Sequence, residues 1–379
     1  MRRWLGAAFS GATVADKATL YRNRSTGFDY VRLGLSLAVA LWHCFWLTLG
    51  MDAKHSWTRV LVLMILPMFF ALSGFLISGS LTRTRSIHEF LTLRAVRIMP
   101  ALAVEVALSA FLIGAAFTTL PLAAYFASPV FHSYFLNIFG DIHFFLPGVF
   151  EHNPTTRVNG SLWTIPYELY CYLAITLLWL VGATRHRRLL LLIVTAMQLV
   201  LPARDLMRGE FIKVDEALPG RMLVLAFLCG VLIYFYREKV VLRLWMFVAA
   251  IVLSLLMLTS VYTSYLVALP AAYITVFLGL TNPRKIPILM DGDYSYGIYL
   301  YASPIQQAVI DLFPAHRTWW FNLLVAFVPF CLFAAFSWHV VEKPVLDHRK
   351  LFVGVVDRCV AGVVNGLRRI AGRPIVPRA

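Results

Sequence analysis

Long apolar stretches separated by short basic segments dominate the residue pattern of this chain. A helix that crosses a bilayer needs about 20 apolar residues, with a range of about 17–25. Ten segments meet this requirement: 30–49, 60–81, 99–120, 164–183, 189–203, 219–236, 244–260, 262–281, 294–313 and 319–341. The fifth is short, and the seventh and eighth are only weakly separated. The pattern predicts an all-α, polytopic membrane protein with ten transmembrane helices.

Composition agrees with a membrane protein. Of the 379 residues, 60% are hydrophobic and 14% are charged, and the mean hydropathy is +0.74. Soluble domains carry about 25% charged residues, so the chain has too little charge for an ordinary soluble enzyme. The five cysteines show no spacing typical of a metal site or a disulfide framework.

The net charge of +15 raises the question of a nucleic-acid partner. The basic residues, however, lie in short segments between apolar runs, where the positive-inside rule accounts for them. With the N-terminus inside, 25 of the 34 Lys and Arg residues fall in cytoplasmic segments and eight in outer segments. We therefore expect no nucleic-acid partner. We expect a multi-pass protein of the inner (cytoplasmic) membrane with both termini in the cytoplasm: a basic tail over 1–29, a transmembrane domain over 30–341 and a basic tail over 342–379.

The segment between the third and fourth predicted helices, residues 121–163, is too long for a simple connection. Loops longer than about 12–15 residues are usually functional or disordered. Eight Phe and Tyr residues between positions 126 and 150 argue against disorder. We expect a long, structured outer loop that covers the outer mouth of the helices.

Ionisable residues at membrane depth are costly and usually functional. Arg32 and His43 lie in the first predicted helix, Glu105 in the third and Glu168 in the fourth. Each of the first three has a structural alternative: Arg32 near the interface can extend toward water, and His43 and Glu105 can simply bond neighbouring helices. A carboxylate such as Glu168 is too costly to face lipid, so we expect it to face a water-filled interior of the helix bundle.

Depth links two of these residues. At about 1.5 Å per residue, His43 lies about 20 Å above the inner face, and Glu168 about 24 Å above it. An imidazole beside a carboxylate is a common pair of general base and orienting acid. Matched depth therefore predicts that Glu168 and His43 share a cavity.

A pair of arginines precedes the third predicted helix. Arg94 and Arg97 are three residues apart and share one face of a helix. Guanidinium groups bind phosphates with paired hydrogen bonds. The pair is thus a candidate anion site, and anchoring by the positive-inside rule is the alternative.

These residues together resemble acyltransferase family 3, the integral-membrane O-acyltransferases of cell-surface polysaccharides and glycolipids. The stretches that carry the resemblance are FDYVR at 28–32 with ten residues between Arg32 and His43, FFALSGFLI at 69–77, Arg94-x-x-Arg97 before Pro100, NGSLWTIPYELY at 159–170 with its Glu-x-Tyr motif, YSYGIYLY at 294–301 and VEKP at 341–344. The similarity spans about residues 27–345. Two features depart from it: Pro67 lies in the second helix, where many members carry an acid, and Glu105 matches no family position.

The resemblance implies an acyl-CoA donor, with acetyl the common acyl group, on the cytoplasmic side. Arg94 and Arg97, together with Arg32, would hold the CoA phosphates. No metal is implied. Further implied partners are the lipid bilayer, a glycan or glycolipid acceptor outside, and polysaccharide-assembly proteins of the cell envelope.

The resemblance also implies the roles at the reacting end. His43 would act as general base on an acceptor hydroxyl, or would carry the acyl group in a two-step relay. Glu168 would orient or charge-balance the imidazole. Tyr170 would donate a hydrogen bond near the developing oxyanion, and the alternative for it is a plain pore-lining aromatic. Ser73 is a poor nucleophile candidate, because the small residues around Gly74 favour close helix packing.

Two other classes remain open from the residues. A multi-helix transporter would also have buried charges, but it would not need a histidine at a fixed distance from a basic residue. An unrelated membrane-bound O-acyltransferase fold is the alternative among enzymes.

Overall fold

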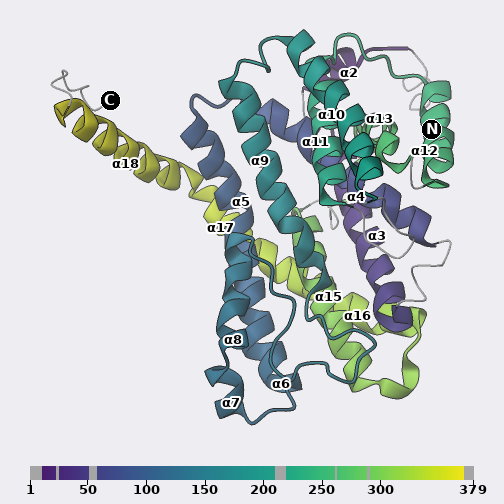
Figure 1. The fold of residues 1–379 in the computed structure, drawn as a ribbon, viewed down its shortest axis with the longest axis vertical. Helices are drawn as coiled ribbons and strands as arrows, with labels where there is room; N and C mark the ends of the chain where they lie inside the picture. Colours follow the sequence, from purple (N-terminus) through teal and green to yellow (C-terminus); the bar gives the residue numbers. More distant parts are fainter. Residues whose placement is uncertain are drawn as a thin grey trace.

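The computed structural model describes residues 11–22, 25–50, 58–209, 219–260, 263–287 and 291–370 (Figure 1). Within these ranges the chain is helical, and two isolated β-bridges, Thr13 with Val241 and Thr118 with Val149, are the only strand-like pairings. This agrees with the predicted all-α class.

Each predicted apolar segment contains a helix. The ten are α3 (Gly27–Leu49), α4 (Thr58–Leu81), α5 (Ile87–Leu108), α9 (Ile165–Leu180), α10 (Arg187–Met207), α11 (Gly220–Phe235), α12 (Leu244–Leu258), α13 (Ala268–Gly279), α15 (Ser295–Leu312) and α16 (Trp319–Phe336). By length and composition, five described stretches are able to cross a membrane: Gly27–Leu49, Leu63–Leu81, Ile87–Phe117, Arg187–Met207 and Trp319–Asp347. Three shorter apolar helices accompany them, so a count of ten membrane crossings stays a prediction.

The third helix begins earlier than the apolar pattern predicts. Ser86 caps the N-terminus of α5 by accepting a hydrogen bond from the Glu89 amide at 3.2 Å, and the helix runs through Pro100. It continues as a π-helical turn, Ser109–Gly114, and α6, Ala115–Phe117. The predicted start at residue 99 is therefore wrong, because the two arginines that interrupt the apolar run lie inside the helix.

Both predicted tails contain helices. In the first, α2 (Val14–Leu20) is capped by Thr13 and Asp16. The Thr13 amide donates to Asp16 Oδ2 at 2.9 Å, and the Asp16 amide donates to Thr13 Oγ1 at 3.1 Å. In the second, α17 (Lys343–Asp347) and α18 (Arg349–Ile370) follow α16. Figure 1 shows α18 projecting from the side of the bundle.

The core forms where α4 and α11 cross. A Cβ atom added at Gly74 would lie 2.0 Å from the carbonyl oxygen of Phe227, and one added at Gly230 would lie 2.1 Å from that of Ala71. Only glycine permits such contact between two backbones. The expectation that Gly74 serves close helix packing is confirmed.

The long segment over 121–163 holds α7 (Leu122–Ala127), α8 (Pro129–Ser133) and two 3-10 turns, Tyr134–Phe139 and Gly160–Thr164. Four of its aromatic side chains, Tyr125, Phe131, Tyr134 and Phe150, are buried, whereas Phe139 and Phe145 are exposed. The Tyr125 hydroxyl donates to the Ala110 carbonyl at 2.6 Å. Figure 1 shows α6, α7 and α8 at one end of the molecule and α2 at the other.

Candidate active site

A cavity of about 310 Å³ lies among α3, α4, α5, α9, α11 and α15. Three arginines, Arg32, Arg94 and Arg97, line it together with Glu168 and Tyr172. The remaining wall is largely apolar and includes Leu66, Phe69, Phe70, Leu76 and Phe227. The cavity thus joins a polar region, which contains the arginines and Glu168, to an apolar one.

Two of the three arginines are already paired. Arg32 and Arg97 both donate to Oδ2 of Asp293, at 2.5 and 2.6 Å, and Arg97 also pairs with Glu342. Burial alone would raise the pKa of Asp293, but the guanidiniums of Arg32 and Arg97 lower it well below its usual range. This ionic cluster joins α3 and α5 to the start of α15 and the end of α16.

Arg94 differs from its two neighbours. Its Nη2 donates to the Ser80 hydroxyl at 3.4 Å, and its Nε is buried without a hydrogen-bond partner in the described part of the chain. Among the described residues it forms no ion pair with a carboxylate. Its positive charge is therefore free for a ligand, whereas those of Arg32 and Arg97 are shared with carboxylates.

Glu168 faces the arginines. It lies in the first turn of α9, lines the cavity, and accepts a hydrogen bond from the Tyr172 hydroxyl at 2.5 Å. The structure therefore brings Arg32, Arg94, Arg97 and Glu168 into one cavity. From the sequence, Arg94 and Arg97 formed a cluster separate from Glu168.

His43 lies outside the residues that line this cavity. Its side chain is buried, and its Nδ1 has no hydrogen-bond partner among the described residues. Its Nε2 faces Gly160, 3.9 Å from the position a Cβ would take there. No hydrogen bond or ion pair joins His43 to Glu168 within the described residues, so the structure does not form the expected pair directly.

Tyr170 also lies away from the cavity. Its side chain is 55% exposed, and its ring contacts Tyr167 with centroids 5.9 Å apart. Tyr172, two residues later, is on the other side of α9 and reaches Glu168. The tyrosine of the Glu-x-Tyr motif is thus the exposed Tyr170, whereas Glu168 is hydrogen-bonded to Tyr172, one helical turn away.

A buried turn holds Gly160 opposite His43. Asn159 donates to Glu105 Oε1 at 2.8 Å and to the Leu300 carbonyl at 2.9 Å, and the Gly160 amide donates to Ser303 Oγ at 2.9 Å. Glu105, which no motif explained, therefore fixes the turn beside the histidine. Sequence reasoning missed Asn159 and Ser303 as site residues, although both lie in or next to stretches that carry the family resemblance.

Helix α15 connects the cavity to this turn. Ser295, Tyr299 and Ser303 are four residues apart and share one face. The Tyr299 hydroxyl bonds Thr164 Oγ1 at 2.5 Å and donates to the Ser161 carbonyl at 3.0 Å. Four residues of helix rise about 6 Å, so the level of Ser303 and Gly160 lies one turn beyond the end of the cavity.

The profile of the acyltransferase domain family matches residues 25–340. The chain belongs to acyltransferase family 3. This acyltransferase is 29% identical over 297 residues to the O-acetyl transferase of Shigella phage Sf6, covering 73% of this chain and 82% of the relative. It is 27% identical over 353 residues to Nodulation protein 10 of Rhizobium leguminosarum bv. viciae, covering 86% and 94%. No solved structure matches it.

The family match and the name of the phage relative identify this protein as an O-acyltransferase. The chain is therefore an enzyme and not a transporter. Its helices are apolar enough to span a membrane, as expected of a membrane acyltransferase. No group of three or more His, Cys, Asp or Glu in the described residues is placed to hold a metal ion.

Proposed function

We propose that this acyltransferase takes a short acyl group, acetyl in the first instance, from cytoplasmic acyl-CoA. It transfers the group to a hydroxyl of a glycan or glycolipid on the outer side of the inner membrane. The phage relative named O-acetyl transferase supports the choice of acetyl. The bias of basic residues toward one side supports the cytoplasmic placement of both termini and of the arginine cavity.

The observation that carries this proposal is the guanidinium of Arg94, which has no ion-pair partner among the described residues and lines a cavity with an apolar wall. A phosphate of CoA supplies the anion that Arg94 lacks, in a charge-assisted and directional contact. Asp293 and Glu342 together offset the charges of Arg32 and Arg97, so Arg94 is the arginine of this cavity without a directly paired carboxylate among the described residues. The apolar wall suits the uncharged pantetheine arm.

The arm has to carry the thioester toward His43. Arg32 and His43 are eleven residues apart on α3, which corresponds to about 16 Å along the helix. The extended pantetheine arm of CoA is long enough to cover this span. The thioester and the acceptor hydroxyl would have to meet the imidazole beside Gly160, where the Nε2 atom of His43 lies 3.9 Å from the position of a Cβ atom.

In the direct route, His43 accepts the proton of the acceptor hydroxyl while that oxygen attacks the thioester carbonyl carbon. The carbon–sulfur bond breaks, and the CoA thiolate takes the proton from the imidazolium. The products are the O-acyl ester and free CoA. In the relay route, the imidazole nitrogen first takes the acyl group and releases CoA, and the acceptor hydroxyl then attacks the acyl-imidazole.

Glu168 balances the charge of the arginines in the cavity and is held by Tyr172. We propose that it acts on the donor side, near the thioester, and not through a direct bond to the imidazole. Tyr170 is the weaker candidate for an oxyanion donor, because its ring is exposed.

The proposal is tested with the purified protein in nanodiscs supplied with acetyl-CoA labelled in the acetyl group. We expect label to appear in an added glycan or glycolipid acceptor, with CoA released in equal amount. Label transfer from another acyl carrier, with none from acetyl-CoA or other short acyl-CoA esters, would contradict the assignment of the donor.

A further inference from the structure

Helix α18 presents an apolar face that no described element covers. Leu351, Val355, Cys359 and Val363 follow one another at intervals of four residues and so share one side of the helix. Their side chains are exposed, with 66% for Leu351, 49% for Val355 and 63% for Val363. Phe352, beside this face, is 44% exposed. A continuous exposed apolar face marks an interaction surface.

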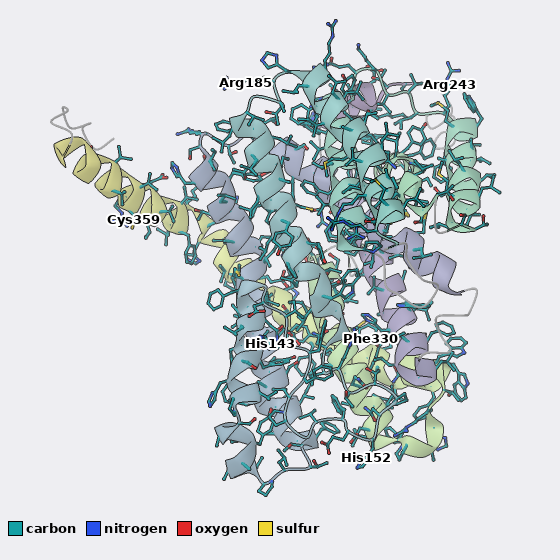
Figure 2. All side chains as sticks on the ribbon, in the orientation of Figure 1. His143, His152, Arg185, Arg243, Phe330 and Cys359 are labelled. Atoms are coloured by element: carbon teal, nitrogen blue, oxygen red, sulfur yellow. The ribbon has the colours of Figure 1, made fainter. Side chains whose placement is uncertain are left out.

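The opposite side of α18 rests on α5. Asp357 Oδ1 pairs with Nε2 of His88 in the first turn of α5 at 2.7 Å. Asp357 and Cys359 are two residues apart, which is about 200° around a helix, so the apolar face points away from α5. In Figure 2, Cys359 is labelled on the part of α18 that projects from the bundle.

Basic residues border the apolar face. Arg349 and Arg358 donate to carbonyl oxygens of their own chain, of Leu346 and Gly354, and form no ion pair within the described residues. Lys350, on the side of the helix that carries Asp357, adds a third positive charge. The single acidic residue of the helix, Asp357, is bound to His88. Such a helix is attracted to a surface that is both apolar and anionic.

The position of α18 along the chain selects that surface. The apolar stretch Trp319–Asp347 is long enough to span a membrane, and α18 begins two residues after it ends. The first turn of α5, which α18 contacts, is likewise the start of an apolar stretch, Ile87–Phe117. Both neighbours put α18 beside the ends of helical stretches that are able to span a membrane.

We propose that α18 is an interfacial helix that lies along the anionic leaflet on the side of the arginine cavity, with Leu351, Val355 and Val363 inserted among the lipid chains. At about 1.5 Å per residue its 22 residues extend about 33 Å along the surface. The assignment of that leaflet to the cytoplasmic side rests on the orientation given under the proposed function.

The native Cys359 provides the test. Of the five cysteines, three are buried and Cys331 is half-buried, so Cys331→Ser leaves Cys359 as the accessible thiol. An environment-sensitive fluorophore on Cys359 is measured in nanodiscs containing the whole protein, with and without anionic phosphatidylglycerol. We expect blue-shifted emission and several-fold weaker quenching by a water-soluble quencher when the anionic lipid is present. This readout does not depend on catalysis, so it fails or succeeds separately from the proposed function.

Two variants test the apolar character of this face. Leu351→Glu with Val355→Glu should restore quenching, whereas Leu351→Ile with Val355→Ile, which keeps the face apolar, should leave the protection intact. The proposal would be overturned if the fluorophore on Cys359 were quenched equally with and without anionic lipid in protein that lacks the glutamate substitutions. Protection that appears only with two protein copies per disc, whatever the lipid, would also overturn it, since the face would then bind a second chain.

Discussion

The unequal pairing of the arginines predicts that Arg94 and Arg97, three residues apart on one helix face, fail in different ways when each is replaced by alanine. Arg94 has no carboxylate partner among the described residues, whereas Arg97 pairs with Asp293 and Glu342. Arg94→Ala should therefore weaken donor binding and leave the fold intact. Arg97→Ala should destabilise the fold.

The magnitudes follow from what each change leaves behind. A hydrogen bond to a charged group contributes about 1.5–3 kcal/mol, so Arg94→Ala should weaken CoA binding about 10- to 150-fold at about 1.4 kcal/mol per factor of ten. Loss of one partner from a buried ion pair costs about 3–5 kcal/mol. Arg97→Ala leaves Glu342, which is 2% exposed, without its counter-charge.

The measurements are a direct titration with CoA and a thermal unfolding curve, both on protein purified in nanodiscs. A rescue variant tests the cause of the instability: Arg97→Leu combined with Glu342→Gln removes the uncompensated carboxylate and keeps the pair of Asp293 with Arg32. It should recover much of the stability that Arg97→Ala loses. Equal losses of CoA affinity in Arg94→Ala and Arg97→Ala, with unchanged unfolding temperatures, would refute the division of roles.

Four further substitutions test the remaining site residues. His43→Ala should lower turnover about 10²–10⁴-fold, the usual effect of losing a general base, while CoA titration stays near normal; near-normal turnover would remove His43 from the mechanism. Glu168→Gln should keep expression and lower turnover, and unchanged rates across the pH range would show that its charge is not used. Tyr172→Phe should reduce activity more than Tyr170→Phe, measured in the same membranes, and the reverse order would restore Tyr170 to the site. Asn159→Ala should lower turnover more than it raises the KM for acetyl-CoA, because it releases the turn beside the histidine; a change in KM alone would place that turn on the donor side.

Each of the ten apolar runs contains a helix, because a long apolar segment satisfies its backbone hydrogen bonds internally when it is helical. They did not give the start of α5, since Arg94 and Arg97 break the run although they lie inside the helix. The contact between Glu168 and His43 was predicted from depth alone. Depth does not determine how each helix is rotated about its axis, and an evenly apolar helix carries little signal of that rotation.

The carboxylates that pair with Arg97 could not be predicted from the sequence for another reason. Asp293 lies in a loop, and its bond to Arg97 joins residues 196 positions apart. Nothing local in the sequence marks such a pair. Glu342 did lie in a recognised stretch, VEKP, but its partner became evident only when α5 and the end of α16 were seen side by side.

The span of the ionic cluster has a consequence for how the chain is made. Arg97 enters the membrane early in synthesis, yet Asp293 follows 196 residues later and Glu342 follows 245 residues later. At a synthesis rate of about 5–20 residues per second, the two carboxylates are made on the order of 10–50 seconds after Arg97. The full cost of about 2.5–3.5 kcal/mol applies to an arginine at the centre of a membrane helix. Arg97 lies toward the start of its apolar stretch, so α5 avoids this cost by remaining near water or the insertion machinery over this interval. Nascent chains stopped before Asp293 should thus be held at the translocon or degraded, whereas chains that have passed Glu342 should be released into the bilayer.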